Sequence, residues 1–373
     1  MRVLHLVLNV HEGGLERVVG DLARNVDRDE FDTHILAVEM LGRLAAGLGE
    51  HAGLHVAKPM SRLSMLRPSS LARDIRRIAP DVLHLHTGVW FKGVRAAKLA
   101  GVRRTIYTEH GRTYPDRFLD RVLDAAAARR TNIIVPVSDR LASEMNHFIG
   151  SAASRIRVVR NGIDTERFRP TSHDNRLRQE LGLARETPVI GTIGRLYPVK
   201  GIDIMLEAFS QLHGDDLDTL SPVLVIAGDG IARARLQLQA YHLGIAARVH
   251  FLGWREDVNT LHGGFDIYTM SSHSEGTSIG LLEAMSAGCC PVVTDVGGNR
   301  DVLGMQLTHR LIPSGDPVAL AHAWRAALDD SGRRRRDAEI ARSRVLQHFA
   351  LRHVVEAYEA MYRGDRTLMD TSA

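Results

Sequence analysis

The chain has 373 residues, of which 44% are hydrophobic and 25% are charged, a balance typical of a globular protein with two domains. No apolar run approaches the ~18 residues that a membrane-spanning helix needs, so we expect no transmembrane segment. The two cysteines, Cys289 and Cys290, are adjacent. This arrangement gives neither a disulfide framework nor metal-ligand spacing, so we expect a reducing, cytoplasmic compartment.

Charge is distributed unevenly around a formal net charge of +4. Residues 1–170 hold 27 Lys and Arg against 19 Asp and Glu, a net charge of +8, and residues 171–373 hold 21 against 25, a net charge of −4. A basic first half allows peripheral contact with an anionic membrane or a phosphorylated acceptor. Ordinary solvated arginines explain any single basic cluster equally well, and we expect no nucleic-acid partner.

The first half alternates short apolar runs with longer amphipathic runs, the pattern of a parallel sheet wrapped by helices. We predict strands over Val3–Leu8, Thr33–Val38, Val82–His86, Arg104–Thr108, Ile133–Val137 and Ile156–Val159. We predict helices over Gly14–Asn25, Ser70–Ile78, Phe91–Ala100, Arg117–Arg130 and Arg140–Phe148.

A second αβ series follows the turn signal at Asn161-Gly162 and a polar linker that reaches Asn175. We predict strands over Val189–Ile193, Val223–Ala227, Val249–Leu252, Ile267–Met270, Pro291–Thr294 and Thr308–Ile312. We predict helices over Ile202–Leu212, Ile231–Leu243, Val258–His262, Ile279–Ala287, Pro317–Leu328 and Val354–Met361, with a solvated turn at residues 333–336. The fold class is therefore α/β, with domains at 1–168 and 169–349 and a last helix within 350–364.

Unusual residues follow the strands of the first half, where ligands of parallel sheets collect. Gly13 and Gly14 come after the first strand and let backbone N–H groups approach a ligand, although paired glycines also make plain turns. His84 and His86 are two apart on one strand and share a face, but no third metal ligand is evident nearby, so we interpret them as polar residues at a strand mouth. His110 directly follows a strand and is a candidate functional residue.

The stretch from Ser271 to Gly288 places small and acidic residues just before an apolar helical run. The N-terminus of such a helix binds phosphate readily because its N–H groups are unpaired. A plain turn and helix is the alternative, but an unpaired acid in so apolar a helix is costly to bury. The candidate ligand-binding residues are Glu275, Gly276, Thr277, Ser278, Ile279 and Glu283.

Other strand ends of the second half carry cations and glycines. Arg195 and Lys200 lie between a strand and a helix, where two cations can hold a diphosphate; two exposed loop cations are the alternative. Gly228-Asp229-Gly230 and Gly253-Trp254 end the next two strands. The convergence of four strand ends is more specific than any one of them.

In these motifs the chain resembles the retaining glycosyltransferases of family 4, which have the two-domain fold called GT-B. The resemblance covers nearly the whole length. The family often has Phe-Gly after the first Glu-Gly, whereas this chain has Thr277 and Ser278. The matching motifs are Gly13-Gly14-x-Glu16, His110, Asn161-Gly162-x-Asp164, Gly194-Arg195-Leu196, Lys200-Gly201, Gly228-Asp229-Gly230, Phe251-x-Gly253, Glu275-x7-Glu283 and Pro291-Val292-Val293.

The resemblance implies two Rossmann-like domains that face each other across a cleft, with the last helix returning to the first domain. The donor would be a nucleotide-diphosphate sugar, most simply a UDP-sugar, and the acceptor a polysaccharide, a lipid-linked glycan or a small molecule. The resemblance implies that Arg195 and Lys200 bind the diphosphate and that Glu283 binds the ribose. Glu275 and the backbone of 276–279 would contact the sugar and the phosphate, and His110 would contact the reacting sugar. Gly13-Gly14 would shape the diphosphate and acceptor side of the cleft.

We expect no metal or other cofactor. Asp27-x-Asp29 and Asp216-x-Asp218 have an acidic spacing suited to a cation, but both lie in charged connections and are interpreted as solvated turns. Arg195 and Lys200 supply the positive charge instead. Two alternatives remain: a nucleotide-sugar epimerase on a similar fold, and a non-catalytic nucleotide-sugar-binding protein.

Overall fold

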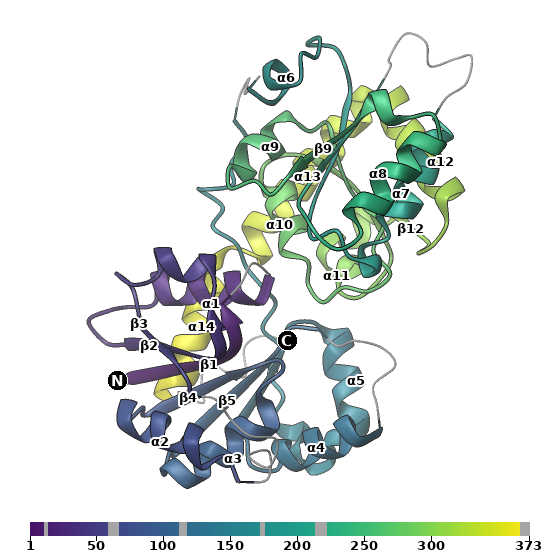
Figure 1. Ribbon diagram of the computed structural model, residues 1–373. Coiled ribbons are helices and arrows are strands. Elements are labelled where there is room, and N and C mark those ends of the chain that lie inside the picture. The colour runs from purple at the N-terminus through teal and green to yellow at the C-terminus, as the bar shows by residue number, and fades with distance from the viewer. Residues whose placement is uncertain (11–13, 59–66, 112–117, 172–175, 213–221, 366–373) are drawn as a thin grey trace. The chain divides into compact units, whose positions relative to one another are not determined.

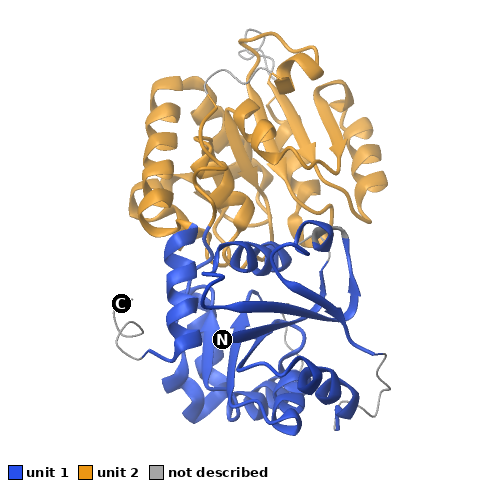
Figure 2. Cartoon of the chain, turned by 90° about the vertical axis from the view of Figure 1, so that its left-hand side faces the viewer, with its two compact units in different colours: residues 1–162, 351–373 blue, residues 163–350 orange. Residues whose placement is uncertain are grey.

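The computed structural model describes residues 1–10, 14–58, 67–111, 118–171, 176–212 and 222–365, which form two compact units (Figures 1 and 2). The first unit comprises Met1–Gly162 and Leu351–Ala373, and the second comprises Ile163–Ala350. The division falls at 162/163 instead of the expected 168/169 because the Ile163 N–H donates to the Phe349 carbonyl at 2.9 Å. The Phe168 ring also lies 6.3 Å from the ring of His262 in the second unit.

The first unit contains a six-stranded parallel sheet in the order β3-β2-β1-β4-β5-β6. Helices cover both faces of this sheet (Figure 1). Its strands are β1 Arg2–Val10, β2 Asp32–Leu41, β3 Gly53–Val56, β4 Val82–His86, β5 Arg104–Glu109 and β6 Ile133–Pro136. Its helices are α1 Gly14–Asn25, α2 Ser69–Ile78, α3 Trp90–Ala100, α4 Phe118–Ala128, α5 Asp139–Ile149 and α14 Leu351–Arg363, with short 3-10 turns at Arg43–Gly47 and Gly150–Arg155.

Alternate residues of β1 pack against helices on opposite faces of the first sheet. Leu4 and Leu6 of β1 join a buried cluster with α2, α3 and α5. Val7 of the same strand lies in a second cluster with α1 on the opposite face. A strand buried on both faces is apolar at most positions, and β1 is apolar between Val3 and Leu8 except at the buried His5.

The second unit repeats this plan with a parallel sheet in the order β12-β11-β10-β7-β8-β9. Its strands are β7 Val189–Ile193, β8 Val223–Ala227, β9 Val249–Gly253, β10 Ile267–Met270, β11 Cys290–Thr294 and β12 Leu311–Ile312. Its helices are α6 Arg176–Glu180, α7 Ile202–Ser210, α8 Arg233–His242, α9 Val258–Gly264, α10 Ile279–Ser286, α11 Asn299–Leu303, α12 Pro317–Asp329 and α13 Ser331–His348, with 3-10 turns at Pro198–Lys200, Ala246–Arg248 and Met305–Arg310.

The two α/β units confirm the predicted fold class, but two predicted strands are wrong in whole or in part. Residues 156–159 form no strand: Ile156 makes an isolated bridge with Ile134, and only the N–H groups of Arg157 and Val159 reach the edge of β6. Of the strand expected over Thr308–Ile312, only Leu311–Ile312 pairs with the sheet. Strand β3 was not predicted because its four residues are largely half-buried and carry little apolar pattern.

The arginine run at 333–336 is helical, which corrects the predicted turn. The Asp330 side chain accepts a hydrogen bond from the Arg333 N–H at 2.7 Å and so caps the N-terminus of α13. The Arg334 guanidinium donates to the Ala327 carbonyl at 2.9 Å, at the end of the preceding helix. Among the helices of the described ranges, none is long and apolar enough to cross a bilayer.

Candidate functional site

The candidate site of the second unit lies where β7 and β10 end side by side. The two strands are parallel neighbours. The helix that follows β7, α7, packs with α8 and α12 on one face, whereas α10 after β10 packs with α9 and α13 on the other (Figure 1). Connections that leave in opposite directions open a crevice at the carboxyl ends of such strands. The predicted residues Arg195, Lys200 and Glu275 lie in these two connections.

Lys200 and Glu275 form an ion pair across the switch point, which is the place where the connections after the neighbouring strands β7 and β10 leave toward opposite faces of the sheet. The Lys200 Nζ lies 2.6 Å from Glu275 Oε1, and the side chains are only 24% and 9% exposed. The Ser272 hydroxyl donates to the same carboxylate oxygen at 2.6 Å. A cation and a buried hydroxyl therefore fix the orientation of the Glu275 carboxylate. The importance of Ser272 was not predicted, although it lies within the stretch identified in the sequence.

Backbone contacts join the same two connections. The Ser271 hydroxyl donates to the Gly201 carbonyl at 2.7 Å, and the His273 N–H donates to the Val199 carbonyl at 2.8 Å. Gly201 has a φ of +60°, and a Cβ atom there would lie 2.2 Å from the Ser271 carbonyl oxygen. Only glycine fits this contact, so the close approach of the two connections depends on it.

Arg195 differs from Lys200 in its surroundings. Its side chain is exposed, and its Cζ lies 5.4 Å from the centroid of the Tyr197 ring. No acidic side chain pairs with it within the part of the chain that the structure describes. The arginine charge is therefore available to a ligand, whereas the lysine charge is already shared with a carboxylate.

Gly228 and Gly253 bring the ends of β7, β8 and β9 together. The Gly228 N–H donates to the Gly253 carbonyl at 2.7 Å, and the Gly194 N–H donates to the Ala227 carbonyl at 3.0 Å. Gly228 has a φ of +134°, and a Cβ there would lie 1.9 Å from the Gly194 carbonyl oxygen. Packing of neighbouring connections by itself explains glycine at 228, and contact with a ligand stays a prediction.

The remaining candidates surround the start of α10. Ser278 is its N-cap: the Leu281 N–H reaches the Ser278 hydroxyl at 3.4 Å. Thr277 is buried, and Ile279 is the first residue of the helix. The Gly276 carbonyl accepts from the Gly298 N–H at 2.9 Å. Glu283 is 2% exposed, with a carboxylate oxygen 3.9 Å from His262 Nε2, so it lies deeper than Glu275.

His110 of the first unit directly follows β5 and is held at both its backbone and its ring. Its N–H donates to the Thr87 hydroxyl at 2.9 Å, and that hydroxyl donates to Glu109 Oε1 at 2.9 Å. Its Nε2 lies 3.0 Å from His86 Nδ1. Burial lowers the pKa of His110 to about 3, because enclosure disfavours the charged ring. His110 is therefore a neutral imidazole at neutral pH.

Other sequence candidates fall in different places. Gly14 begins α1, whereas Gly13 lies outside the described residues. Asp27 accepts a hydrogen bond from the Asp29 N–H at 2.9 Å and so closes its own turn. Asp216 and Asp218 lie outside the described residues.

We expect Gly201→Ala to destabilise the second unit more than Gly244→Ala. Both glycines have a left-handed φ, +60° and +71°, but a Cβ at Gly244 meets no atom within 4 Å. The control should lose about 1 kcal/mol of unfolding free energy. Gly201→Ala should lose a further 1–3 kcal/mol or so because the Ser271 carbonyl must move. Urea unfolding measures both values, and equal losses would contradict the close contact.

Comparisons with known proteins agree with this arrangement. A family model described as "Glycosyltransferase Family 4" matches residues 12–167, and one described as "Glycosyl transferases group 1" matches residues 173–344. The chain is 25% identical over 346 residues to the UDP-Gal:alpha-D-GlcNAc-diphosphoundecaprenol alpha-1,3-galactosyltransferase of Escherichia coli, with 88% of each chain covered. It is 27% identical over 340 residues to a D-inositol 3-phosphate glycosyltransferase of Corynebacterium urealyticum, covering 84% of this chain and 79% of that enzyme.

A solved structure of similar fold is HepE of Anabaena, crystallised with UDP and glucose. The two structures have a TM-score of 0.86 at 23% sequence identity, over 98% of this chain and 100% of that chain. The two family models occupy the two αβ series in turn, and the fold agreement extends over both. The chain therefore belongs to the family 4 glycosyltransferases and has their GT-B fold.

Proposed function

We propose that this enzyme transfers a sugar from a UDP-sugar, with retention of anomeric configuration, to a polysaccharide, lipid-linked or small-molecule acceptor. The observation that carries the proposal is the Lys200–Glu275 pair at the switch point of the second sheet. The printed names of the relatives support the donor class: the Escherichia coli enzyme uses UDP-Gal, and the Anabaena protein was crystallised with UDP and glucose. The acceptors in the relatives' names are a lipid diphosphate glycan and an inositol phosphate.

In this proposal the diphosphate is bound by Arg195 and Lys200. Arg195 is exposed and pairs with no acid in the described ranges, so it can approach a phosphate without breaking an ion pair. The Lys200 ammonium has three N–H donors, so it can keep its bond to Glu275 while it donates to a phosphate oxygen. The two cations would stabilise the negative charge that develops on the departing diphosphate, which makes a metal ion unnecessary.

Glu275 is proposed to contact the donor sugar. Both of its bonds, from Lys200 and Ser272, fall on Oε1, which leaves Oε2 able to accept from a sugar hydroxyl. Glu283 is proposed to accept hydrogen bonds from the ribose, and Gly276, Thr277, Ser278 and Ile279 to offer backbone N–H groups. The donor site would be lined by Gly13, Gly14, Gly228 and Gly253. His110 would contact the transferred sugar.

The activity is tested by incubating the protein with UDP-galactose and with UDP-glucose, first without and then with lipid-linked and soluble sugar acceptors. We expect UDP to raise the melting temperature and the donor to be consumed with release of UDP. An isomerised sugar nucleotide without UDP release would identify an epimerase. Stabilisation by UDP with no transfer to any acceptor would identify a non-catalytic binding protein.

The proposed division of roles between Lys200 and Glu275 predicts different kinetic defects. Lys200→Ala should weaken UDP binding about 10- to 100-fold, since a hydrogen bond to a charged group contributes about 1.5–3 kcal/mol. Glu275→Gln should keep the UDP affinity and lower donor turnover about 10²-fold. Calorimetry with UDP and UDP release from the donor measure the two effects. Lys98→Ala, an exposed lysine of α3, is the control. Unchanged UDP affinity in Lys200→Ala would remove it from the diphosphate site.

We further propose that the first unit docks on an anionic membrane surface through α4. Phe118 and Leu119 at its start are 83% and 64% exposed, which is unusual for large apolar side chains. Arg129 and Arg130 follow its last residue and are also exposed. An exposed apolar pair at one end of a helix and two exposed cations at its other end suit a bilayer with acidic headgroups. This contact would be peripheral, at the cytoplasmic face of the inner membrane.

The membrane proposal predicts binding to vesicles of phosphatidylcholine that contain phosphatidylglycerol, and much weaker binding to phosphatidylcholine alone. Phe118→Asp with Leu119→Asp should abolish co-sedimentation, because each substitution removes an inserted apolar group and adds repulsion. The control is Ile231→Asp, at an apolar residue of the second unit that is 77% exposed. Equal binding of both variants would contradict docking through α4.

A further inference from the structure

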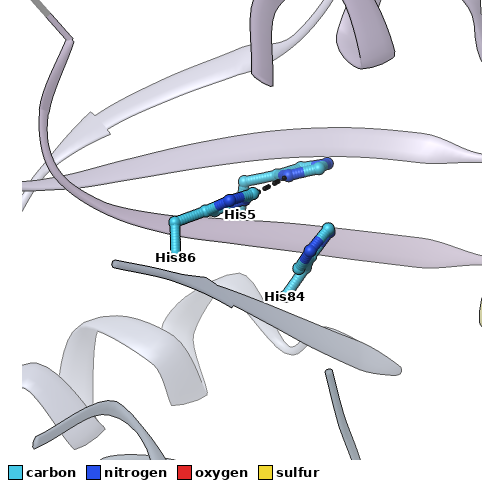
Figure 3. Close-up of side chains that lie close together, drawn as sticks. All are labelled: His5, His84 and His86. Carbon is cyan, nitrogen blue, oxygen red and sulfur yellow. Dashed lines mark hydrogen bonds between the residues drawn. The ribbon is translucent and has the colours of Figure 1, made fainter. Parts of the chain in front are cut away.

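A row of histidines crosses one face of the first sheet and ends at His110. His5 of β1 and His84 of β4 are register partners, so their side chains lie next to each other. His86 lies two residues further along β4 on the same face. Figure 3 shows the rings of His5, His84 and His86 gathered on these two strands, with a hydrogen bond between His5 and His86.

The rings are uncharged at neutral pH. His5, His84 and His86 are at most 1% exposed. Burial lowers the pKa of His5 to about 4 and the pKa values of His84 and His86 well below the usual range. A neutral imidazole has one N–H group and one lone pair, so the partner of one ring nitrogen decides whether the other donates or accepts.

The ring of His84 contacts the rings of His5 and His86, but both of its nitrogens bond to hydroxyl groups and not to another histidine. Its Nδ1 lies 2.9 Å from the Tyr362 hydroxyl, which comes from α14, and its Nε2 lies 2.8 Å from the Thr108 hydroxyl of β5. The Thr108 hydroxyl also contacts the Tyr358 hydroxyl at 2.9 Å. Both ring nitrogens of His84 are therefore used by residues outside the row.

The other three rings form a continuous chain. His5 Nδ1 lies 3.1 Å from His86 Nε2, and His86 Nδ1 lies 3.0 Å from His110 Nε2. One end of this chain is His110 Nδ1, which is buried and has no hydrogen-bond partner among the residues that the structure describes. Because each ring has one proton, all the bonds of the chain must point in the same direction. In one direction His110 Nδ1 carries a proton, and in the other it has a lone pair.

A metal site is the competing explanation, since ring nitrogens of His5, His84 and His86 lie within 4.8 Å of one another. A metal there would have to replace the bonds of His84 to Tyr362 or Thr108 and the bond between His5 and His86. The hydrogen bonds already account for these nitrogens. The chain of rings is therefore the stronger explanation.

We propose that His86 is a positioning residue for His110, which it holds by ring-to-ring hydrogen bonding, and that the bond between His5 and His86 couples the tautomers of these two rings. The tautomer of His110, and with it the donor or acceptor character of its Nδ1, is thereby tied to the tautomer of His86. The inference rests on the proposed function only in the role of His110 as a sugar contact. The geometry of the chain itself is independent of the reaction.

The test compares His86→Leu with His86→Asn and His84→Leu. Leucine removes both bonds of His86, whereas the amide of asparagine retains a polar group near the position of Nδ1. His84→Leu is the control, because it makes the same replacement at an equally buried histidine whose nitrogens bond to Tyr362 and Thr108 and not to His110. The ¹⁵N chemical shifts of the His110 ring show which of its nitrogens carries the proton. Turnover of the UDP-sugar shows whether a change at His110 alters the reaction rate.

We expect His86→Leu to change the His110 ring signals and to lower turnover about 10²-fold, with UDP affinity within about twofold of the wild type. His86→Asn should restore much of the turnover, and His84→Leu should leave the His110 signals unchanged. Unaltered His110 signals in His86→Leu would overturn the proposal, as would stoichiometric zinc in the purified protein that is lost in His84→Leu. Altered signals in a protein that transfers no sugar would support positioning and refute the proposed function instead.

Discussion

The ion pair between Lys200 and Glu275 joins the connections that follow two neighbouring strands and leave toward opposite faces of the sheet. β7 and β10 are parallel neighbours whose following helices cover opposite faces, so the backbone diverges directly after both strands. The ion pair, the Ser271 hydroxyl and the close approach at Gly201 tie the diverging segments together. A ligand that binds Lys200 therefore acts directly on the orientation of Glu275.

Charge at this site is unequally distributed between the two cations. Lys200 is neutralised by a carboxylate, whereas Arg195 lies in solvent over an aromatic ring. An exposed guanidinium loses little solvation when it meets a phosphate, and the paired ammonium need not give up its carboxylate. The family membership indicates a nucleotide-sugar donor, and two cations at one site are compatible with the diphosphate of such a donor.

The first unit has the same strand order but a different chemistry at its centre. Its switch point, between β1 and β4, holds imidazoles that burial keeps neutral. Charged groups are tolerated in the second unit because they are paired or reach solvent, whereas an unpaired charge inside the first sheet would be costly. Because the rings are neutral, a hydrogen bond between two of them fixes their relative orientation without a net charge. The hydrogen bond between His86 and His110 includes His110 in this arrangement.

Hydrophobic periodicity in the sequence determined the two αβ series, and the glycine and acid motifs determined the family, because both depend on local spacing. Periodicity failed at 156–159, where pairing stops, and at 333–336, where Asp330 caps a helix. Only the tertiary structure decided that Lys200 pairs with the carboxylate of Glu275, which is 75 residues away in the sequence. The same holds for the hydrogen bond between His84 and the hydroxyl of Tyr362, which is 278 residues away. Such pairs depend on which strands and helices become neighbours, and no local pattern in the sequence specifies that order.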